Sequence, residues 1–117
     1  MNTIIISEIS NEAASKTKGL LLKEHLEPLL KSNTGNISVD FSTITRFASP
    51  FFNNSFAALA LVYGFDAVHS IKLDNISDVG LATYQTSMEN AKTVSEHPEH
   101  ITEMNQIIDN TPKKVTS

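Results

Sequence analysis

The chain contains no cysteine among its 117 residues, so disulfide bonds, thiol catalysis and cysteine-ligated zinc are all excluded. Arginine occurs once, at Arg46, and the 9 basic residues are outnumbered by 13 acidic ones, which gives a net charge of −4. Nucleic-acid-binding domains usually present a basic face, and this charge balance argues against one. We therefore expect no nucleic-acid partner.

Long apolar runs and glycine-rich stretches are also missing. The longest apolar run near the N-terminus, residues 4–6, is too short for a signal peptide or a membrane span, so we expect a cytoplasmic protein without membrane contact. The four glycines are widely scattered, no lysine stands in a P-loop context, and no nucleophile elbow is present. The sequence thus shows no catalytic constellation, and we expect neither enzymatic activity nor a cofactor.

The histidines give a weak hint of a metal site. Two of the four fall in an acidic cluster, which consists of Glu96, His97, Glu99, His100 and Glu103. Pro98 separates the two histidines and no pair has i, i+4 spacing, so the regular arrangement of helical metal ligands is absent. We interpret the cluster as a solvated acidic helix end and expect no metal.

The residues that are present describe one globular domain. Hydrophobic residues make up 40% and charged residues 19%, which excludes a disordered chain and allows a single modest core. We expect the domain to cover residues 1–110, with residues 111–117 as a polar C-terminal tail.

Hydrophobic periodicity predicts strands and helices in alternation. Strands are expected at residues 3–6, 37–41 and 68–73. Helices are expected at 17–31, with a kink or an interruption at Pro28, and at 50–64, ending at Gly64. A further helix is expected from 77 to about 97, with Ser77 as its cap and an apolar stripe of Leu81, Tyr84, Met88, Ala91 and Val94, and another around 101–108. This order of strand, helix, strand, helix, strand, helix and a C-terminal helix predicts an α/β fold with a small mixed or parallel sheet.

Residues 37–58 are the most informative stretch. Apolar residues alternate with polar ones from Ile37 to Phe41, which is typical of a strand with one buried face. A polar loop follows, and Ser49 before Pro50 predicts a helix N-terminus with Ser49 as the N-cap. A loop that leads from a strand into a helix N-terminus is a common place for phosphate chemistry or partner recognition.

The segment VDFSTITRFASPFF resembles the strand–loop–helix signature of STAS domains, the fold of bacterial anti-sigma-factor antagonists. The chain is most similar to the STAS-like domain family of unknown function, over roughly residues 16 to 95. The motifs of that family appear here as Val39-Asp40-Phe41, Ser49-Pro50-Phe51-Phe52 and Lys72-Leu73-Asp74-Asn75. The resemblance implies a STAS-like fold and a regulatory module that binds and releases a histidine-kinase-like ATPase or kinase.

Several positions depart from the family pattern. The serine that is phosphorylated in the antagonists aligns with Pro50, which leaves Ser49 as the hydroxyl in the turn. Phe51 stands where STAS-like members often carry serine, and Thr43 stands where the pattern has glycine. Full STAS domains usually carry another strand before the last helix, and none is expected between residues 91 and 97. The sheet is therefore expected to be small, with an edge available for pairing.

The resemblance and the local pattern together predict a binding surface at the loop and helix start, residues 42–55. The candidate partner-binding or regulatory residues are Asp40, Ser42, Ser49, Phe51, Asn53 and Asn54. Ser49 is either a plain N-cap or a phosphoacceptor, and Asp40 either an acceptor for loop amides or an acidic partner contact. Phe51 either tucks under the preceding loop or forms an exposed apolar patch, which Asn53 and Asn54 would rim.

Two alternatives to a partner-binding module remain at this point. The helix start can bind a small anionic ligand or a nucleotide, because free amides and the helix dipole favour negative charge there. The chain can also be the subunit of a structural homodimer that associates through the Phe51 face.

Overall fold

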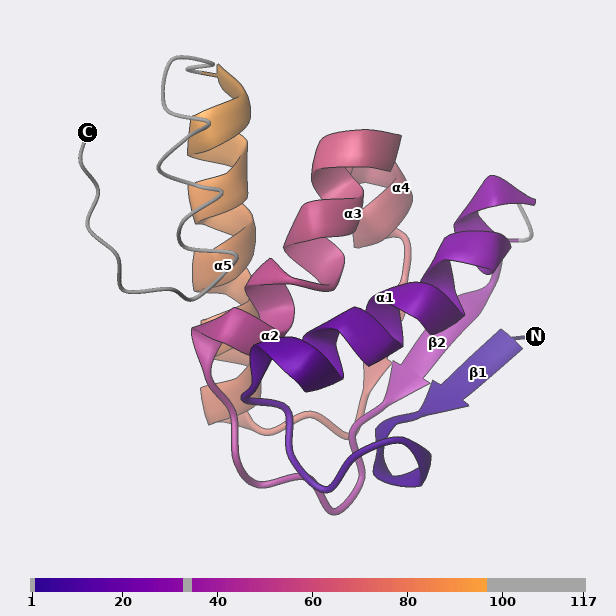
Figure 1. The fold of residues 1–117 in the computed structure, drawn as a ribbon, viewed down its shortest axis with the longest axis vertical. Coiled ribbons are helices and arrows are strands. Elements are labelled where there is room, and N and C mark those ends of the chain that lie inside the picture. Colours follow the sequence, from indigo (N-terminus) through magenta and orange to yellow (C-terminus); the bar gives the residue numbers. More distant parts are fainter. Residues whose placement is uncertain (1, 33–34, 97–117) are drawn as a thin grey trace.

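The computed structural model describes residues 2–32 and 35–96 (Figure 1). The elements are β1 (Asn2–Ile5), the 3₁₀-helix η1 (Ile6–Glu8), α1 (Lys16–Lys31), β2 (Ile37–Asp40), α2 (Ser49–Asn53), α3 (Phe56–Tyr63), α4 (Phe65–His69), β3 (Lys72–Asp74) and α5 (Asp78–Glu96). The predicted C-terminal helix, the predicted tail and the acidic cluster beyond Glu96 lie outside the described residues.

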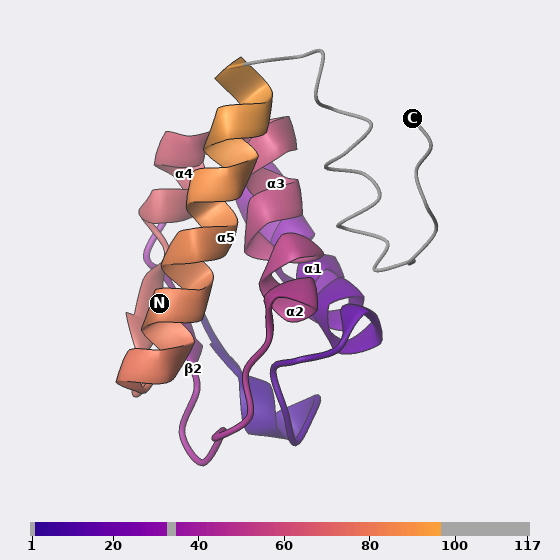
Figure 2. The same ribbon diagram turned by 90° about the vertical axis from the view of Figure 1, so that its left-hand side faces the viewer.

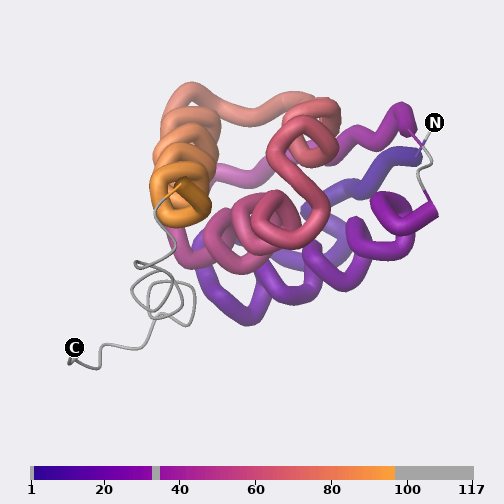
Figure 3. The backbone as a smooth tube through the Cα atoms, turned by 90° about the horizontal axis from the view of Figure 1, so that it is seen from above, coloured from indigo at the N-terminus to yellow at the C-terminus, as the bar shows by residue number. Residues whose placement is uncertain are grey.

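The three strands form one parallel sheet in the order β1-β2-β3, as the alternation of strands and helices predicts. The helices cover one face of the sheet (Figures 1 and 3). Ile4, Val39 and Leu73 are in register and form a row on this face, because Val39 belongs to the core and the other two pack against it. The opposite face carries the polar row of Thr3, Ser38 and Lys72. The domain is thus a two-layer α/β structure with its core between the sheet and the helices.

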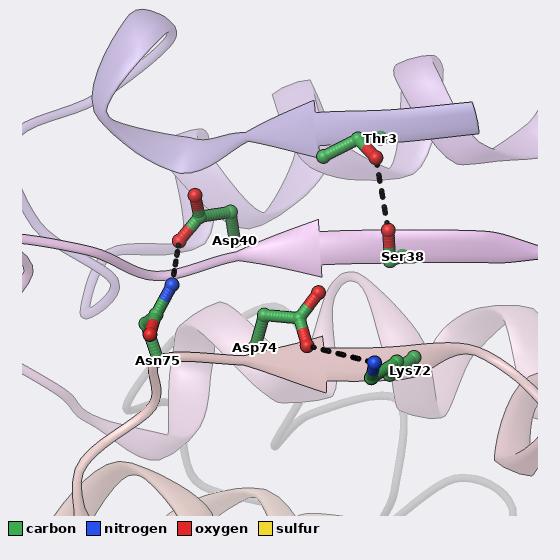
Figure 4. A network of polar contacts seen from close by, with 6 residues as sticks. All are labelled: Thr3, Ser38, Asp40, Lys72, Asp74 and Asn75. Atoms are coloured by element: carbon green, nitrogen blue, oxygen red, sulfur yellow. Dashed lines mark hydrogen bonds and ion pairs between the residues drawn. The ribbon is translucent and has the colours of Figure 1, made fainter. Parts of the chain in front are cut away.

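Strand β2 departs from the predicted alternation of buried and exposed residues. Ser38 lies on the polar face but is only 3% exposed. The strand is central, and the Ser38 hydroxyl is 3.0 Å from the Thr3 hydroxyl on β1 (Figure 4). A side chain as small as serine is covered by its neighbours on both sides, which sequence alternation alone does not reveal.

Helix α2 lies between α1 and α5 (Figure 2). Both Phe51 and Phe52 are therefore fully buried, on different sides of the same short helix. Phe52 packs in a cluster of rings that also contains Phe41, Phe47, Phe56 and Tyr84. On the α1 side, a side chain at Gly19 would collide with the Phe51 carbonyl oxygen, so glycine lets the two helices approach closely.

The predicted helix over residues 50–64 is interrupted at Asn54 and Ser55, and this prediction is corrected. The Asn54 side-chain amide donates to the Pro50 carbonyl at 2.7 Å, and the Ser55 hydroxyl donates to the Phe51 carbonyl at 2.8 Å. Ser55 has φ −122° and ψ −91°, outside the helical region. Local side-chain hydrogen bonds of this kind compete with the backbone ladder and break the helix into α2 and α3.

The third predicted strand is shorter than expected. Residues 65–69 form α4, and only Lys72–Asp74 form β3, so Val68 is buried in a helix and not in a strand. Gly64 ends α3 at φ +102°, as predicted, and the next helix begins directly after it. The short apolar run around Val68 fits a buried helix as well as a strand, which explains the error.

The ends of the long helices follow local capping rules. Helix α1 begins after Ser15, whose hydroxyl accepts from the Lys18 amide at 3.2 Å. The helix continues through Pro28 to Lys31, so the expected interruption at Pro28 is wrong. The Gly80 amide donates to the Ser77 hydroxyl at 3.2 Å, so Ser77 caps α5 as predicted. The apolar stripe predicted for α5 is buried except at Leu81, which is 37% exposed.

Candidate functional site

Three loops meet at one end of the sheet because its strands are parallel (Figure 1, bottom). They follow β1, β2 and β3 and cover residues 6–15, 41–48 and 75–77. The Ala13 amide donates to the Arg46 carbonyl at 2.9 Å and the Ala48 amide to the Ala13 carbonyl at 3.1 Å, which joins the first two loops. We call the exposed residues here the carboxyl-end surface; they are Ser7, Glu8, Asn11, Thr43, Thr45, Arg46, Ser49, Asn75 and Ser77.

Asp40 organises the part of this end that follows β2 (Figure 4). Its Oδ1 accepts from the Ser42 hydroxyl at 2.6 Å, the Asn75 side-chain amide at 3.0 Å and the Ser42 backbone amide at 2.9 Å. These hydrogen bonds, that of the Ser42 hydroxyl first, lower the pKa of Asp40 below its ordinary value. Asp40 is therefore an acceptor for its own loop, and its predicted contact with a partner stays a prediction.

Thr43 adopts an unusual backbone conformation in the same turn. Its φ is +69°, a left-handed region that β-branched residues rarely occupy. The side chain is exposed, so no burial explains the choice of threonine. Thr43 stands where the family pattern has glycine, and the structure shows that this position needs a glycine-like conformation.

Ser49 is exposed but is not the N-cap of α2. The helix begins at Ser49 itself, its N-cap is Ala48, and no side chain caps this end. The N-cap interpretation of Ser49 is therefore wrong by one residue, because Ala48 already has the extended backbone of a cap, with φ −154° and ψ 156°. The phosphoacceptor interpretation is not tested by this geometry and stays a prediction.

The prediction of an exposed apolar patch at Phe51 with an asparagine rim is wrong. Phe51, Asn53 and Asn54 are 0%, 2% and 1% exposed. Asn53 accepts a hydrogen bond from the Ser87 hydroxyl of α5 at 2.5 Å, and Asn54 bonds back to its own helix. These side chains are internal because α2 has a helix on either side, a tertiary arrangement that local sequence does not specify.

Glu12 was not among the predicted site residues, yet it shapes the loop beside Arg46. Its carboxylate accepts from the Ala14 amide at 2.6 Å and from the Ser15 amide and hydroxyl at 3.1 Å. Burial raises the pKa of Glu12, but these hydrogen bonds and the Arg46 charge outweigh burial, so the pKa is lowered overall. Glu12 precedes Ser15, the N-cap of α1, by three residues, and this spacing was a sequence signal for the local hydrogen bonds that Glu12 accepts.

A separate open groove of about 400 Å³ lies between α4 and α5. Its lining consists of Phe65, His69, Tyr84, Gln85, Met88, Glu89 and Lys92. None of these residues was predicted to bind a ligand, and none belongs to the carboxyl-end surface.

Within residues 2–32 and 35–96, no group of three or more histidine and acidic side chains is arranged to hold a metal ion. In the same ranges, none of the helices combines the length and apolar character that crossing a membrane requires.

Comparison with protein-family models matches residues 19–81, more than half of the chain, to the family described as STAS-like domain of unknown function. The matched region runs from α1 into the first turn of α5 and includes the loop after β2, whereas β1 lies outside it. Searches among curated proteins and among solved structures give no significant match.

Proposed function

The chain belongs to the family of STAS-like domains of unknown function, and from this premise we propose that it is a non-catalytic regulatory module that binds a protein partner at its carboxyl-end surface. The proposed interface contains the exposed part of the predicted region, residues 42–49, and not the buried residues 51–55. From the resemblance to anti-sigma-factor antagonists, the proposed partner is a histidine-kinase-like ATPase or kinase that the module binds and releases.

The observation that carries this proposal is the gathering of three exposed polar loops at one end of a parallel sheet. In open α/β sheets, ligands commonly bind outside the carboxyl ends of the strands, and we extend this preference to a protein partner. The loops after β1 and β2 are bonded to each other through Ala13, so they present a fixed shape. A preorganised loop surface lowers the entropy lost on binding.

Arg46 is the residue that we expect to contribute most to the interface. It is the single arginine of the chain, it is exposed, and Glu12 lies near its charge. Arginine is enriched among interface residues that dominate binding energy, because its planar head makes several hydrogen bonds at once. Thr45 and Ser49 are exposed in the same segment and can add hydroxyl contacts.

The proposal is tested by purifying the tagged full chain from its native source and then measuring affinity for any protein recovered in near-equal amount. Arg46→Glu should weaken that complex by at least about tenfold, whereas Lys31→Glu should not change it. Lys31 is exposed at the C-terminal end of α1, whereas the carboxyl-end surface adjoins the N-terminal end of this helix. Lys31→Glu reverses a positive charge, as Arg46→Glu does. Recovery of the chain without any stoichiometric partner would contradict the proposal, and normal binding by both Arg46→Glu and Thr45→Arg would place the interface elsewhere.

In this proposal Ser49 is the regulatory residue of the surface, because its hydroxyl is exposed within the proposed interface. A phosphate there would add negative charge next to the partner contact and would change affinity. Ser49→Asp should alter partner binding while Ser49→Ala leaves it close to wild type. Equal binding by both variants, together with no phosphate on Ser49 by mass spectrometry, would exclude Ser49 as the switch.

A further inference from the structure

The groove between α4 and α5 contains a buried polar group that the fold does not use (Figure 2). Tyr84 lines this groove and is only 8% exposed. Its ring makes edge contacts with Phe52 and Phe56, at 5.8 and 5.3 Å between ring centroids. Among the residues that the structure describes, the Tyr84 hydroxyl has no hydrogen-bond partner. Buried tyrosine hydroxyls usually have one, so an unpaired hydroxyl on a groove wall indicates a site for a ligand atom.

The Tyr84 hydroxyl is available both as a donor and as an acceptor. Burial raises the pKa of Tyr84, which keeps its phenol protonated at neutral pH. The ring packs on two core phenylalanines, so the outer end of the side chain, which carries the hydroxyl, is the part that reaches the groove.

The groove also offers apolar surfaces that suit a flat ring. Phe65 of α4 is partly buried, Met88 of α5 is 4% exposed, and both line the groove. Aromatic rings pack favourably against phenylalanine and against the methionine thioether. The groove volume of about 400 Å³ lies within the range of small-molecule pockets, roughly 300–1,000 Å³. A small aromatic ligand therefore fits this part of the groove in size and in chemistry.

Two opposite charges lie on the rim of the groove. Glu89 and Lys92 are exposed on α5 and line the groove, and neither forms an ion pair with any part of the chain that the structure describes. Tyr84, Met88 and Lys92 are spaced by four residues each, so they follow one side of α5 over a helix rise of about 12 Å. Along α5 the groove thus presents a hydroxyl, an apolar middle and a pair of opposite charges.

We propose that this groove binds a free aromatic amino acid that carries a hydroxyl group on its ring, which is the chemistry of tyrosine. The ring of the ligand packs between Phe65 and Met88, and its hydroxyl pairs with that of Tyr84. The ammonium and carboxylate groups of the ligand pair with Glu89 and Lys92. This inference goes beyond the proposed function, because none of these residues belongs to the carboxyl-end surface.

Titration of the full chain with L-tyrosine, followed by NMR, tests the proposal. We expect saturable shifts of the Met88 methyl signal and of the Gln85 and Lys92 amides, with a Kd below about 1 mM. L-Alanine, which lacks the ring, should give no saturable shift. N-acetyl-L-tyrosinamide keeps the ring and its hydroxyl without either charge and should bind about fivefold more weakly. Absence of saturation by L-tyrosine, saturable shifts confined to another surface, or equal binding of the uncharged amide would overturn the proposal.

A cycle of ligand and variant isolates the pair of hydroxyls. The wild-type chain should prefer L-tyrosine to L-phenylalanine about fivefold, the effect of one net hydrogen bond. Tyr84→Phe keeps the ring contacts in the core and should abolish this preference. Tyr63→Phe is the matched control, because it removes a hydroxyl that donates to Glu27 outside the groove, and it should keep the preference. A preference that survives Tyr84→Phe would overturn the proposal.

Lys92→Glu tests the charged end of the site. Reversal of this charge should weaken L-tyrosine binding about fivefold, because attraction to the ligand carboxylate becomes repulsion. Lys31→Glu makes the same change at an exposed residue of α1 outside the groove and should bind normally. Equal binding by the two variants would overturn the proposed orientation and with it the proposal. Arg46→Glu should bind L-tyrosine normally, which separates this test from that of the proposed function.

Discussion

Residues 42–49 and 51–55 are adjacent in the sequence, yet they differ in environment, although Ile44 of the first segment is also buried. The first segment is a polar loop with exposed side chains at Thr43, Thr45, Arg46 and Ser49. Every residue of the second segment is buried. The loop leaves the carboxyl end of β2 at the surface, and the chain then enters the space between α1 and α5. Polarity alone does not separate the proposed binding surface from the core, because Asn53, Asn54 and Ser55 are polar and buried.

The strongest test of this contrast is a lysine at Phe51. Phe51→Lys places a charge in a fully buried site between two helices, where it has no partner, and should lower the free energy of unfolding by about 4 kcal/mol or more. Val62→Lys makes the same type of change at a side chain that is 68% exposed and should change stability by less than about 0.5 kcal/mol. Urea denaturation measures both, and a Phe51→Lys variant as stable as wild type would show that α2 is not internal.

The hydrogen bond between Asn53 and Ser87 offers a second test within the buried segment. Asn53→Ala leaves the Ser87 hydroxyl without its acceptor in the core and should cost about 2–3 kcal/mol. Ser87→Ala and the double variant complete a cycle that isolates the pair from the cavity left by each truncation. Strictly additive losses in denaturation experiments would mean that the pair does not couple α2 to α5.

Thr43 tests the exposed segment, where a substitution should stabilise the protein. Thr43→Gly relieves a left-handed conformation that costs an L-residue about 1–2 kcal/mol, and we expect a net gain of about 1 kcal/mol after the entropy of glycine in the unfolded chain. Thr45→Gly, at an exposed residue of the same loop without a positive φ, should be neutral or destabilising. A loss of stability in Thr43→Gly would contradict the strain, and thermal unfolding measures the difference.

The smallest expected effect concerns the protonation of Asp40. Hydrogen bonds lower its pKa in the folded state, so the stability that they provide is present above the ordinary pKa of 3.8 and is lost as the pH falls through the lowered value. The difference in stability between wild type and Asp40→Asn should therefore shrink on acidification below about pH 4. Asn75→Ala should raise the pKa of Asp40 in an NMR titration, and an unchanged pKa would show that the Asn75 contact does not form in solution.

Much of the fold could be predicted because its determinants are local or periodic. The strand around Val39, the end of α3 at Gly64 and the cap at Ser77 follow from patterns within a few residues, and the structure confirms them. The family match also confirms the resemblance that the motifs around Asp40 and Leu73 carry. Errors occurred where side chains compete with the backbone, as at Ser55, or where a short apolar run fits both a helix and a strand, as at Val68.

The candidate site was harder to predict, because exposure depends on contacts between distant segments. Phe51 and Asn53 follow a loop and precede a helix, which suggested a surface, but α1 and α5 come from both ends of the chain to cover them. Asn75 reaches Asp40 only because β2 and β3 are neighbours in the sheet. The polar character of residues 42–49 could be predicted from the sequence. That none of the exposed side chains in this segment is apolar could not be predicted, because it depends on which residues the fold buries.

The parallel arrangement of the sheet has a consequence for how the chain folds. Asn2 pairs with Ile37 and Ser38 pairs with Lys72, so the partners are separated by 35 and 34 positions. No pair of strands can form as a local hairpin, and each requires closure of a long loop before its contacts stabilise it. The helices α1 and α5 can begin to form from local contacts, whereas each strand pair depends on contacts between distant segments. During synthesis, more than thirty further residues must therefore be added after β1 before β2, its partner among the described strands, is available.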